Sequence, residues 1–221
     1  MVRLVVDARE PDRETIARAA AIVRAGGVAA VPTDTLYGLA VDPFDASAVG
    51  RLFTIKSRSQ ERALPLVAAD AGQVRAVLGV LSPLGERLAS SFWPGPLTLV
   101  MRAPEGLAVE VTGGGTTVGV RVPADAVVRA LCAAVGTPLT ATSANVSGQP
   151  PTANPDDVAA ALGGSIDVLV DSGRTRGGPP STIVDVTGPV PHLIRAGAVE
   201  WEHVLAAAGA APPQEPNAPR S

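Results

Sequence analysis

The sequence predicts one α/β domain of the α+β type, built on a mixed sheet with flanking helices. Two observations favour this class. Short apolar runs of strand length are interspersed with amphipathic helical stretches, without the strict alternation of a purely parallel sheet. Several pairs of successive strands look antiparallel. At 221 residues and 46% hydrophobic content, the chain is long enough to bury one large core.

The N-terminal part is predicted to start with a strand at 3–7 and to continue into a helix at 13–24. Residues spaced for one buried helix face are Ile16, Ala19, Ala20 and Val23. Gly26 and Gly27 follow and are typical of a helix end.

The next segment holds a strand end and a helix. The apolar run 28–31 stops at Pro32, which cannot donate to a strand ladder, so we expect the polar residues 33–35 to form a turn there. Val49, Leu52 and Phe53 then recur at helical spacing, and Lys56 continues the same face at i+7. A cation therefore lies at the end of an otherwise buried stripe.

The remaining elements follow from the same periodicities and from turn residues. Strands are predicted at 64–68, 97–101, 107–111, 117–122, 138–141, 167–171, 181–186 and 191–195. Helices are predicted at 71–78, 82–91, 124–135, 155–162 and 200–208, with Asn154 as the cap of the fourth. We expect 107–111 and 117–122 to pair with each other around the glycines 113–115. The domain should span 1–209, and the Ala/Pro-rich segment 210–221 should be a disordered tail.

Composition excludes several classes of function. The net charge is −3 and aromatic residues make up 3%, which argues against a global attraction to nucleic acid and against a stacking platform for single strands. A single cysteine, Cys132, excludes disulfides and cysteine metal clusters, and its apolar helical context predicts a buried structural thiol. With no signal peptide and no membrane-spanning apolar run, we expect a cytoplasmic protein.

Lys56 is the only lysine among the 18 lysine and arginine residues. Lysine is a compact point charge and arginine a planar fork, so a lysine at this position suggests a specific role for the side chain. A helix-end lysine that complements the helix dipole is the competing interpretation.

Common catalytic motifs are absent: the sequence has no phosphate-binding loop, dinucleotide fingerprint, nucleophile elbow or zinc-protease motif. Short polar motifs remain at predicted strand ends and loops: Thr33-Asp-Thr-x-Tyr37, Lys56-x-Arg58, Arg121, Ser143-x-Asn145, Ser181-Thr182 and Arg195. Hydroxyls can fix a small polar ligand, and cations can pair with phosphate or carboxylate. This set lacks an obvious nucleophile or general base. It suits a reaction driven by positioning and charge neutralisation, such as phosphoryl or nucleotidyl transfer.

Taken together and in order, the motifs resemble those of the YrdC-like family of threonylcarbamoyl-AMP synthases. The matching segments are Pro32-Thr-Asp-Thr-Leu-Tyr-Gly-Leu39, Lys56-Ser-Arg58, Phe92-Trp-Pro-Gly-Pro-Leu-Thr98, Val120-Arg-Val-Pro123, Pro138-Leu-x-x-x-Ser143-Ala-Asn-x-Ser-Gly148, Ser181-Thr-Ile-Val-Asp185 and Ile194-Arg-x-Gly197. The chain departs from the family pattern after Lys56-x-Arg58, where Ser59 and Arg62-Ala63 stand, and at Val67 and Thr142.

The resemblance implies that the mixed sheet is open and twisted and forms a large concave pocket. It also implies a reaction between L-threonine, bicarbonate and ATP. N-carboxythreonine would attack the α-phosphate, giving threonylcarbamoyl-AMP and pyrophosphate, with Lys56 and Arg58 as the catalytic cations. The residues implied to bind threonine are Thr35, Tyr37, Arg121, Ala141 and Ser181. The residues implied to bind ATP are Lys56, Arg58, Arg62, Thr117, Ser143, Asn145 and Arg195.

The resemblance also implies that Mg²⁺ is carried with the nucleotide rather than held by a dedicated protein site. A separate tRNA threonylcarbamoyl transferase complex would receive the product, and direct contact with tRNA would be weak.

Two other functions stay open on the sequence. One is a non-catalytic RNA-binding module in tRNA or ribosome maturation, which the net charge disfavours. The other is a sister enzyme that makes a carbamoyl-adenylate or acyl-adenylate with a different acceptor. Dependence on threonine would separate the sister enzyme from the synthase.

Overall fold

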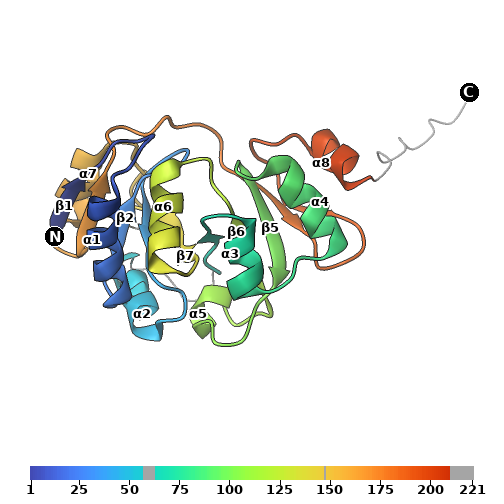
Figure 1. The fold of residues 1–221 in the computed structure, drawn as a ribbon, viewed down its shortest axis with the longest axis horizontal. Helices are drawn as coiled ribbons and strands as arrows, with labels where there is room; N and C mark the ends of the chain where they lie inside the picture. Colours follow the sequence, from blue (N-terminus) through green and yellow to red (C-terminus); the bar gives the residue numbers. More distant parts are fainter. Residues whose placement is uncertain (57–62, 147, 210–221) are drawn as a thin grey trace, which may run out of the picture.

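The computed structural model describes residues 1–56, 63–146 and 148–209. Within these residues the strands form two mixed sheets with helices packed around them (Figure 1). One sheet has five strands in the order β1-β9-β2-β3-β8, and the other has six in the order β11-β10-β5-β6-β4-β7. The α/β class with open mixed sheets is confirmed, but the strands divide into two sheets where one was expected.

The strands are β1 (Val2–Val5), β2 (Ala29–Val31), β3 (Gly38–Ala40), β4 (Leu66–Val67), β5 (Leu97–Arg102), β6 (Thr117–Arg121), β7 (Leu139–Thr140), β8 (Thr142–Ser143), β9 (Val168–Asp171), β10 (Thr182–Asp185) and β11 (His192–Arg195). The helices are α1 (Arg13–Arg24), α2 (Ala46–Lys56), α3 (Ala71–Gln73) with a π-helical turn η1 (Val74–Leu78), α4 (Pro83–Phe92), α5 (Val109–Thr112), α6 (Ala126–Val135), α7 (Pro155–Leu162) and α8 (Trp201–Ala208).

The five-stranded sheet has a parallel part and an antiparallel part. Strands β1, β9 and β2 run parallel, whereas β3 runs antiparallel to both β2 and β8. The turn expected at 33–35 is confirmed and connects β2 to β3. Strand β3, which the sequence analysis did not predict, leads the chain back from this turn.

The six-stranded sheet corrects one predicted pairing. Strand β6 pairs antiparallel with β5 on one edge and parallel with β4 on the other. Because both edges of β6 are occupied, no edge remains for 107–111, which was predicted to be its partner. Residues Val109–Thr112 form the single helical turn α5 instead, with Val111 buried and Val109 exposed. Five residues of alternating apolar character do not separate a short strand from one helical turn.

The two sheets meet at a short extended segment. The predicted strand at 138–141 is present as the shorter β7, which pairs with β4 in one sheet, and an unpredicted strand β8 follows directly and pairs with β3 in the other. Between them, the Ala141 amide donates to the Pro65 carbonyl at 2.8 Å. This junction places residues of both sheets around a common space.

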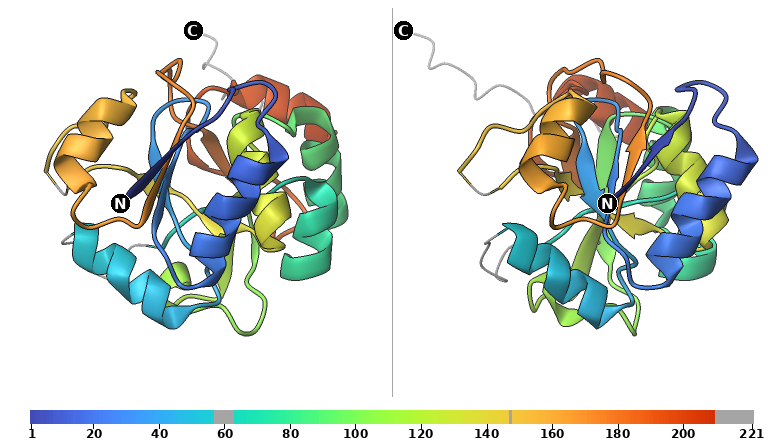
Figure 2. Two further views of the ribbon diagram at one scale, coloured as in Figure 1. Left: turned by 60° about the vertical axis from the view of Figure 1, so that its left-hand side comes forward. Right: turned by 90° about the vertical axis from the view of Figure 1, so that its left-hand side faces the viewer.

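Helices cover the five-stranded sheet on both sides, as Figure 2 shows, with α1 and α6 on one side and α2 and α7 on the other. One buried cluster accordingly contains the apolar faces of α1 and α6, including Cys132, and a second contains those of α2 and α7. Helix α1 has the predicted bounds, and Asn154 caps α7 by accepting from the Asp156 amide. No helix in the described part of the chain is long and apolar enough to cross a membrane.

Candidate active site

A cavity of about 250 Å³ lies where the two sheets meet. Its lining comes from the β2–β3 turn, from β4 to β6, from the β7–β8 junction and from β10 and β11. The predicted site residues in its lining are Thr35, Tyr37, Arg121, Ala141, Ser143, Ser181 and Arg195. Segments more than 150 residues apart in the sequence therefore meet at one cavity, as the motif pattern predicted.

The turn between β2 and β3 is held by its own hydroxyls and by the loop after β9. The Thr33 hydroxyl donates to the Leu36 carbonyl at 2.7 Å. The Thr35 carbonyl accepts from the Gly177 amide at 2.9 Å and from the Thr175 hydroxyl at 2.7 Å. These bonds fix the backbone of Thr35 while its side chain lines the cavity.

Arg121, at the end of β6, is the buried cation of the cavity. Its side chain is only 11% exposed, and its Nη2 lies 3.5 Å from Oδ2 of Asp34. Burial lowers the pKa of the guanidinium; Asp34 opposes this shift and the nearby charge of Arg195 adds to it. An arginine stays protonated in a protein, so the site carries a desolvated positive charge suited to a carboxylate or phosphate.

Asp34 connects this cation to helix α6. Its Oδ1 accepts from the Asp125 amide at 2.7 Å, while Oδ2 is buried without a hydrogen bond. The Asp125 carboxylate in turn accepts from the Val127 and Val128 amides and caps the helix. Burial raises the pKa of Asp125, with the charge of Asp34 adding to the rise. Asp34 was not among the predicted site residues. The signal that could have identified it is its position between Thr33 and Thr35 at the end of a predicted strand.

Arg195 is the exposed cation of the cavity, at the end of β11. Its Nη2 donates to the Ser181 carbonyl at 2.7 Å and to the Ser181 hydroxyl at 3.1 Å. That hydroxyl also lies 2.9 Å from the hydroxyl of Thr98. A Cβ on Gly197 would lie 2.3 Å from the Pro180 carbonyl, so only glycine allows the two segments to approach this closely.

Lys56 lies behind the cavity wall. Its side chain is buried at 4% exposure. Its Nζ donates to the Ser143 carbonyl at 2.7 Å and to the carbonyl and Oδ1 of Asn145 at 2.7 and 2.8 Å. Ser143 lines the cavity, whereas Lys56 and Asn145 are not among its lining residues. Lys56 therefore holds the Ser143 backbone through a hydrogen bond from outside the cavity lining.

Tyr37 is a lining residue whose hydroxyl is bonded to a neighbouring loop. The side chain is fully buried, and its hydroxyl donates to the Gly173 carbonyl at 2.7 Å and accepts from the Ser172 amide. Burial raises the pKa of this phenol to about 12. The hydroxyl thus anchors the loop after β9.

One described residue among the predicted ATP-binding residues, Thr117, is absent from the lining of this cavity and is not bonded to a residue in it. It begins β6, four residues before Arg121, and alternation along a strand places both side chains on the same face of the sheet. Arg58 and Arg62 lie outside the described residues.

The cavity therefore offers two cations of different burial, a group of hydroxyls and an apolar wall that includes Val67. Among the described residues, no three His, Cys, Asp or Glu side chains come together as a metal site. This arrangement can hold an anionic, hydroxyl-bearing ligand by charge-assisted hydrogen bonds.

Comparisons with known proteins agree with this geometry. The family profile for Sua5, YciO and YrdC, described as "Telomere recombination", matches residues 21–197. A protein named threonylcarbamoyl-AMP synthase from Thiobacillus denitrificans is 39% identical over 171 residues, covering 77% of this chain and 90% of the relative. One with the same name from Pyrococcus abyssi is 37% identical over 202 residues, covering 91% of this chain and 59% of the relative.

The crystal structure of Sua5 from P. abyssi complexed with L-threonine superposes with a TM-score of 0.87 at 35% identity, covering 95% of this chain and 61% of that chain. The chain thus spans about three fifths of the P. abyssi proteins and nine tenths of the T. denitrificans relative.

Proposed function

The chain belongs to the Sua5/YciO/YrdC family, and we propose on that basis that it makes threonylcarbamoyl-AMP and pyrophosphate from L-threonine, bicarbonate and ATP. The observation that carries the proposal is the convergence of Thr35, Arg121 and Ser181 on one cavity. The activity is a nucleotidyl transfer, with tRNA modification in the cytoplasm as its use. A separate transferase complex would consume the product.

On the threonine side, the buried Arg121 binds the α-carboxylate through its guanidinium fork. Asp34 and the capped end of α6 hold this fork in place before the substrate arrives. The hydroxyls of Thr35 and Ser181 supply polar contacts to the amino acid, and the Ala141 segment closes the wall at the sheet junction. Positioning of this kind lowers the activation free energy of the reaction, because the entropy cost of orienting the reacting groups is met when the substrate binds.

On the nucleotide side, Arg195 faces the phosphates from the exposed rim, and Ser143 contacts them from the opposite wall. Lys56 and Asn145 hold the Ser143 segment in shape. Thr117 lies further along the same sheet face as Arg121, where a nucleotide larger than the cavity would extend. Arg58 and Arg62 complete the predicted cationic set, and Mg²⁺ is part of the substrate, bound through phosphate oxygens.

The chemical step is a displacement at phosphorus. The threonine nitrogen and bicarbonate first give N-carboxythreonine with loss of water. A carboxylate oxygen of this intermediate then forms a bond to the α-phosphorus, and the bond to the bridging oxygen of the β-phosphate breaks. Pyrophosphate leaves with that oxygen and its electron pair, and the site cations neutralise the charge that develops.

Pyrophosphate release from ATP by the purified protein tests the proposal, measured with and without L-threonine and bicarbonate and with serine and glycine as controls. Release that requires both threonine and bicarbonate is the expected result. Binding of ATP without any effect of threonine would overturn the choice of substrate and favour the sister enzyme. Absence of nucleotide binding would overturn the activity as a whole.

A further inference from the structure

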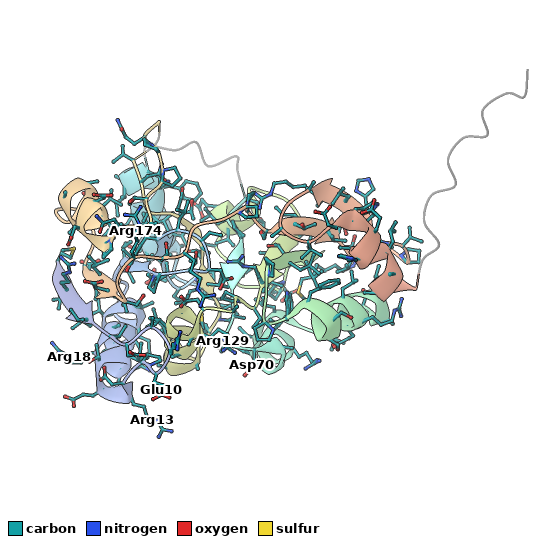
Figure 3. The ribbon with its side chains drawn as sticks, turned by 90° about the horizontal axis from the view of Figure 1, so that it is seen from above. Glu10, Arg13, Arg18, Asp70, Arg129 and Arg174 are labelled. Carbon is teal, nitrogen blue, oxygen red and sulfur yellow. The ribbon has the colours of Figure 1, made fainter. Side chains whose placement is uncertain are left out.

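A second cavity, of about 480 Å³, lies beside the candidate active site and shares Thr33 with it. Its lining includes three arginines from two separate loops: Arg9 from the β1–α1 loop, and Arg174 and Arg176 from the loop that joins β9 to β10. Figure 3 labels Arg174 on this second loop. Neither the synthase activity nor the motif pattern accounts for this arginine-lined cavity.

The three arginines are exposed. The structure records no ion pair for their side chains with any described residue. This differs from Arg3, Arg51, Arg75 and Arg121, each of which lies within 4.0 Å of a carboxylate oxygen. Three arginines and two carboxylates, Asp34 and Asp125, line the same cavity, so its lining carries an excess of positive charge that an oxyanion would offset.

The other polar groups of the cavity are already engaged. Asp125 accepts from the first amides of α6, so the helix terminus itself is occupied. Asp34 lies against Arg121 and the Asp125 amide. The Thr175 hydroxyl donates to the Thr35 carbonyl. Of the two carboxylates, Asp34 is paired with Arg121, so the three arginines outnumber the one remaining acidic charge of Asp125 in the lining.

The geometry points to a second oxyanion site formed by Arg9, Arg174 and Arg176, and we propose that it takes a phosphate-bearing ligand. Arginine forks match the oxygens of a phosphate in pairs. Two sources share this chemistry: free pyrophosphate that has left the neighbouring cavity, and a backbone phosphate of RNA. The pyrophosphate source rests on the proposed synthase activity, whereas the test of the site does not, because it measures binding without turnover.

Occupancy of this site would also stabilise the loop that it shares with the active site. The Gly177 amide and the Thr175 hydroxyl hold the Thr35 carbonyl, and the Tyr37 hydroxyl holds Gly173. An anion that fixes Arg174 and Arg176 therefore reduces the freedom of the segment that carries these bonds. We expect slower hydrogen exchange at residues 172–177 when the anion is bound.

Isothermal titration with inorganic pyrophosphate and with a short RNA oligonucleotide tests the site. Pyrophosphate can also bind at Arg195, so the wild type and Arg195→Ala are compared with the double variant Arg174→Ala/Arg176→Ala. Arg18→Ala is the matched control, because Arg18 is an exposed arginine on α1 (Figure 3). None of the double-variant positions belongs to the proposed catalytic machinery.

We expect saturable binding that persists in Arg195→Ala, weakens about tenfold or more in the double variant, stays unchanged in Arg18→Ala and falls as salt is added. Binding of pyrophosphate identifies the free anion as the source, and binding of RNA alone identifies the backbone phosphate. The proposal is overturned if neither probe binds saturably, if the double variant binds as the wild type does, or if Arg18→Ala weakens binding equally.

Discussion

The two cations of the candidate active site are held in opposite ways. Arg121 lies on an inner strand, is 11% exposed and faces a carboxylate whose Oδ2 has no hydrogen bond. Arg195 lies on an edge strand, is exposed and is held by the neutral oxygens of Ser181. The buried cation is therefore fixed before a ligand arrives but depends on Asp34 for charge balance. The exposed cation can move with its ligand at little cost to the fold.

Removing the buried cation is expected to have the largest effect. Arg121→Ala should lower threonine-dependent pyrophosphate release about 100-fold or more, because a desolvated bidentate contact is lost. It should also destabilise the protein by about 1–3 kcal/mol, because Asp34 is left buried without its counter-charge. Urea denaturation measures the loss of stability.

The double variant Asp34→Asn/Arg121→Ala tests the role of Asp34. It should recover part of the stability that Arg121→Ala loses and none of the activity. A double variant no more stable than Arg121→Ala would contradict the role assigned to Asp34.

Lys56 tests whether a cation behind the wall matters as much as one inside the cavity. Lys56→Met keeps the length of the side chain but removes the donor shared by Ser143 and Asn145. We expect turnover to fall about tenfold or more while the protein still folds, because each charge-assisted hydrogen bond contributes about 1.5–3 kcal/mol. Steady-state kinetics and circular dichroism measure the two outcomes. Near-normal turnover would show that this support is dispensable.

Removing the exposed cation Arg195 should weaken the binding of ATP while leaving the stability of the protein almost unchanged. Arg195→Ala is expected to raise the KM for ATP about tenfold, in a way that added salt diminishes, because an exposed phosphate contact is lost. Stability should change by no more than about 0.5 kcal/mol, as is typical of exposed positions. Thermal unfolding together with KM at two salt concentrations checks both statements. A loss of stability as large as that of Arg121→Ala would remove the contrast between the two cations.

The smallest effect concerns Tyr37, which anchors the loop beside the buried cation. Tyr37→Phe should cost about 1 kcal/mol at pH 7, since the hydroxyl no longer bonds Gly173 and Ser172. Burial raises the phenol pKa from its ordinary 10.0 to about 12, so the unfolded chain releases this proton first. The wild type should therefore lose stability as the pH rises from about 10 to 12, and the difference between the two proteins should narrow and then change sign.

Urea denaturation from pH 7 to 12 follows that difference. The buried Cys132 thiol, whose pKa is also raised to about 12, is common to both proteins and cancels in the comparison. A difference that stays constant across this range would contradict the assignment.

The sequence by itself determined the α/β class and the bounds of helices such as α1 and α7, and seven of the site residues that the family resemblance implied line the cavity. Periodicity and caps are local properties, so they can be read from neighbouring residues. The sequence motifs occur along the chain in the order that the family pattern requires. The family profile that matches residues 21–197 supports the same family assignment.

Only the tertiary structure decided the pairing of β6 with β5 and the placement of the successive strands β7 and β8 in different sheets, because strand pairing depends on which edges are free. It also showed Asp34 beside Arg121, Lys56 behind Ser143 and the Tyr37 hydroxyl turned to a loop. Burial and charge pairing arise between residues that lie far apart in the sequence, and no local pattern encodes them.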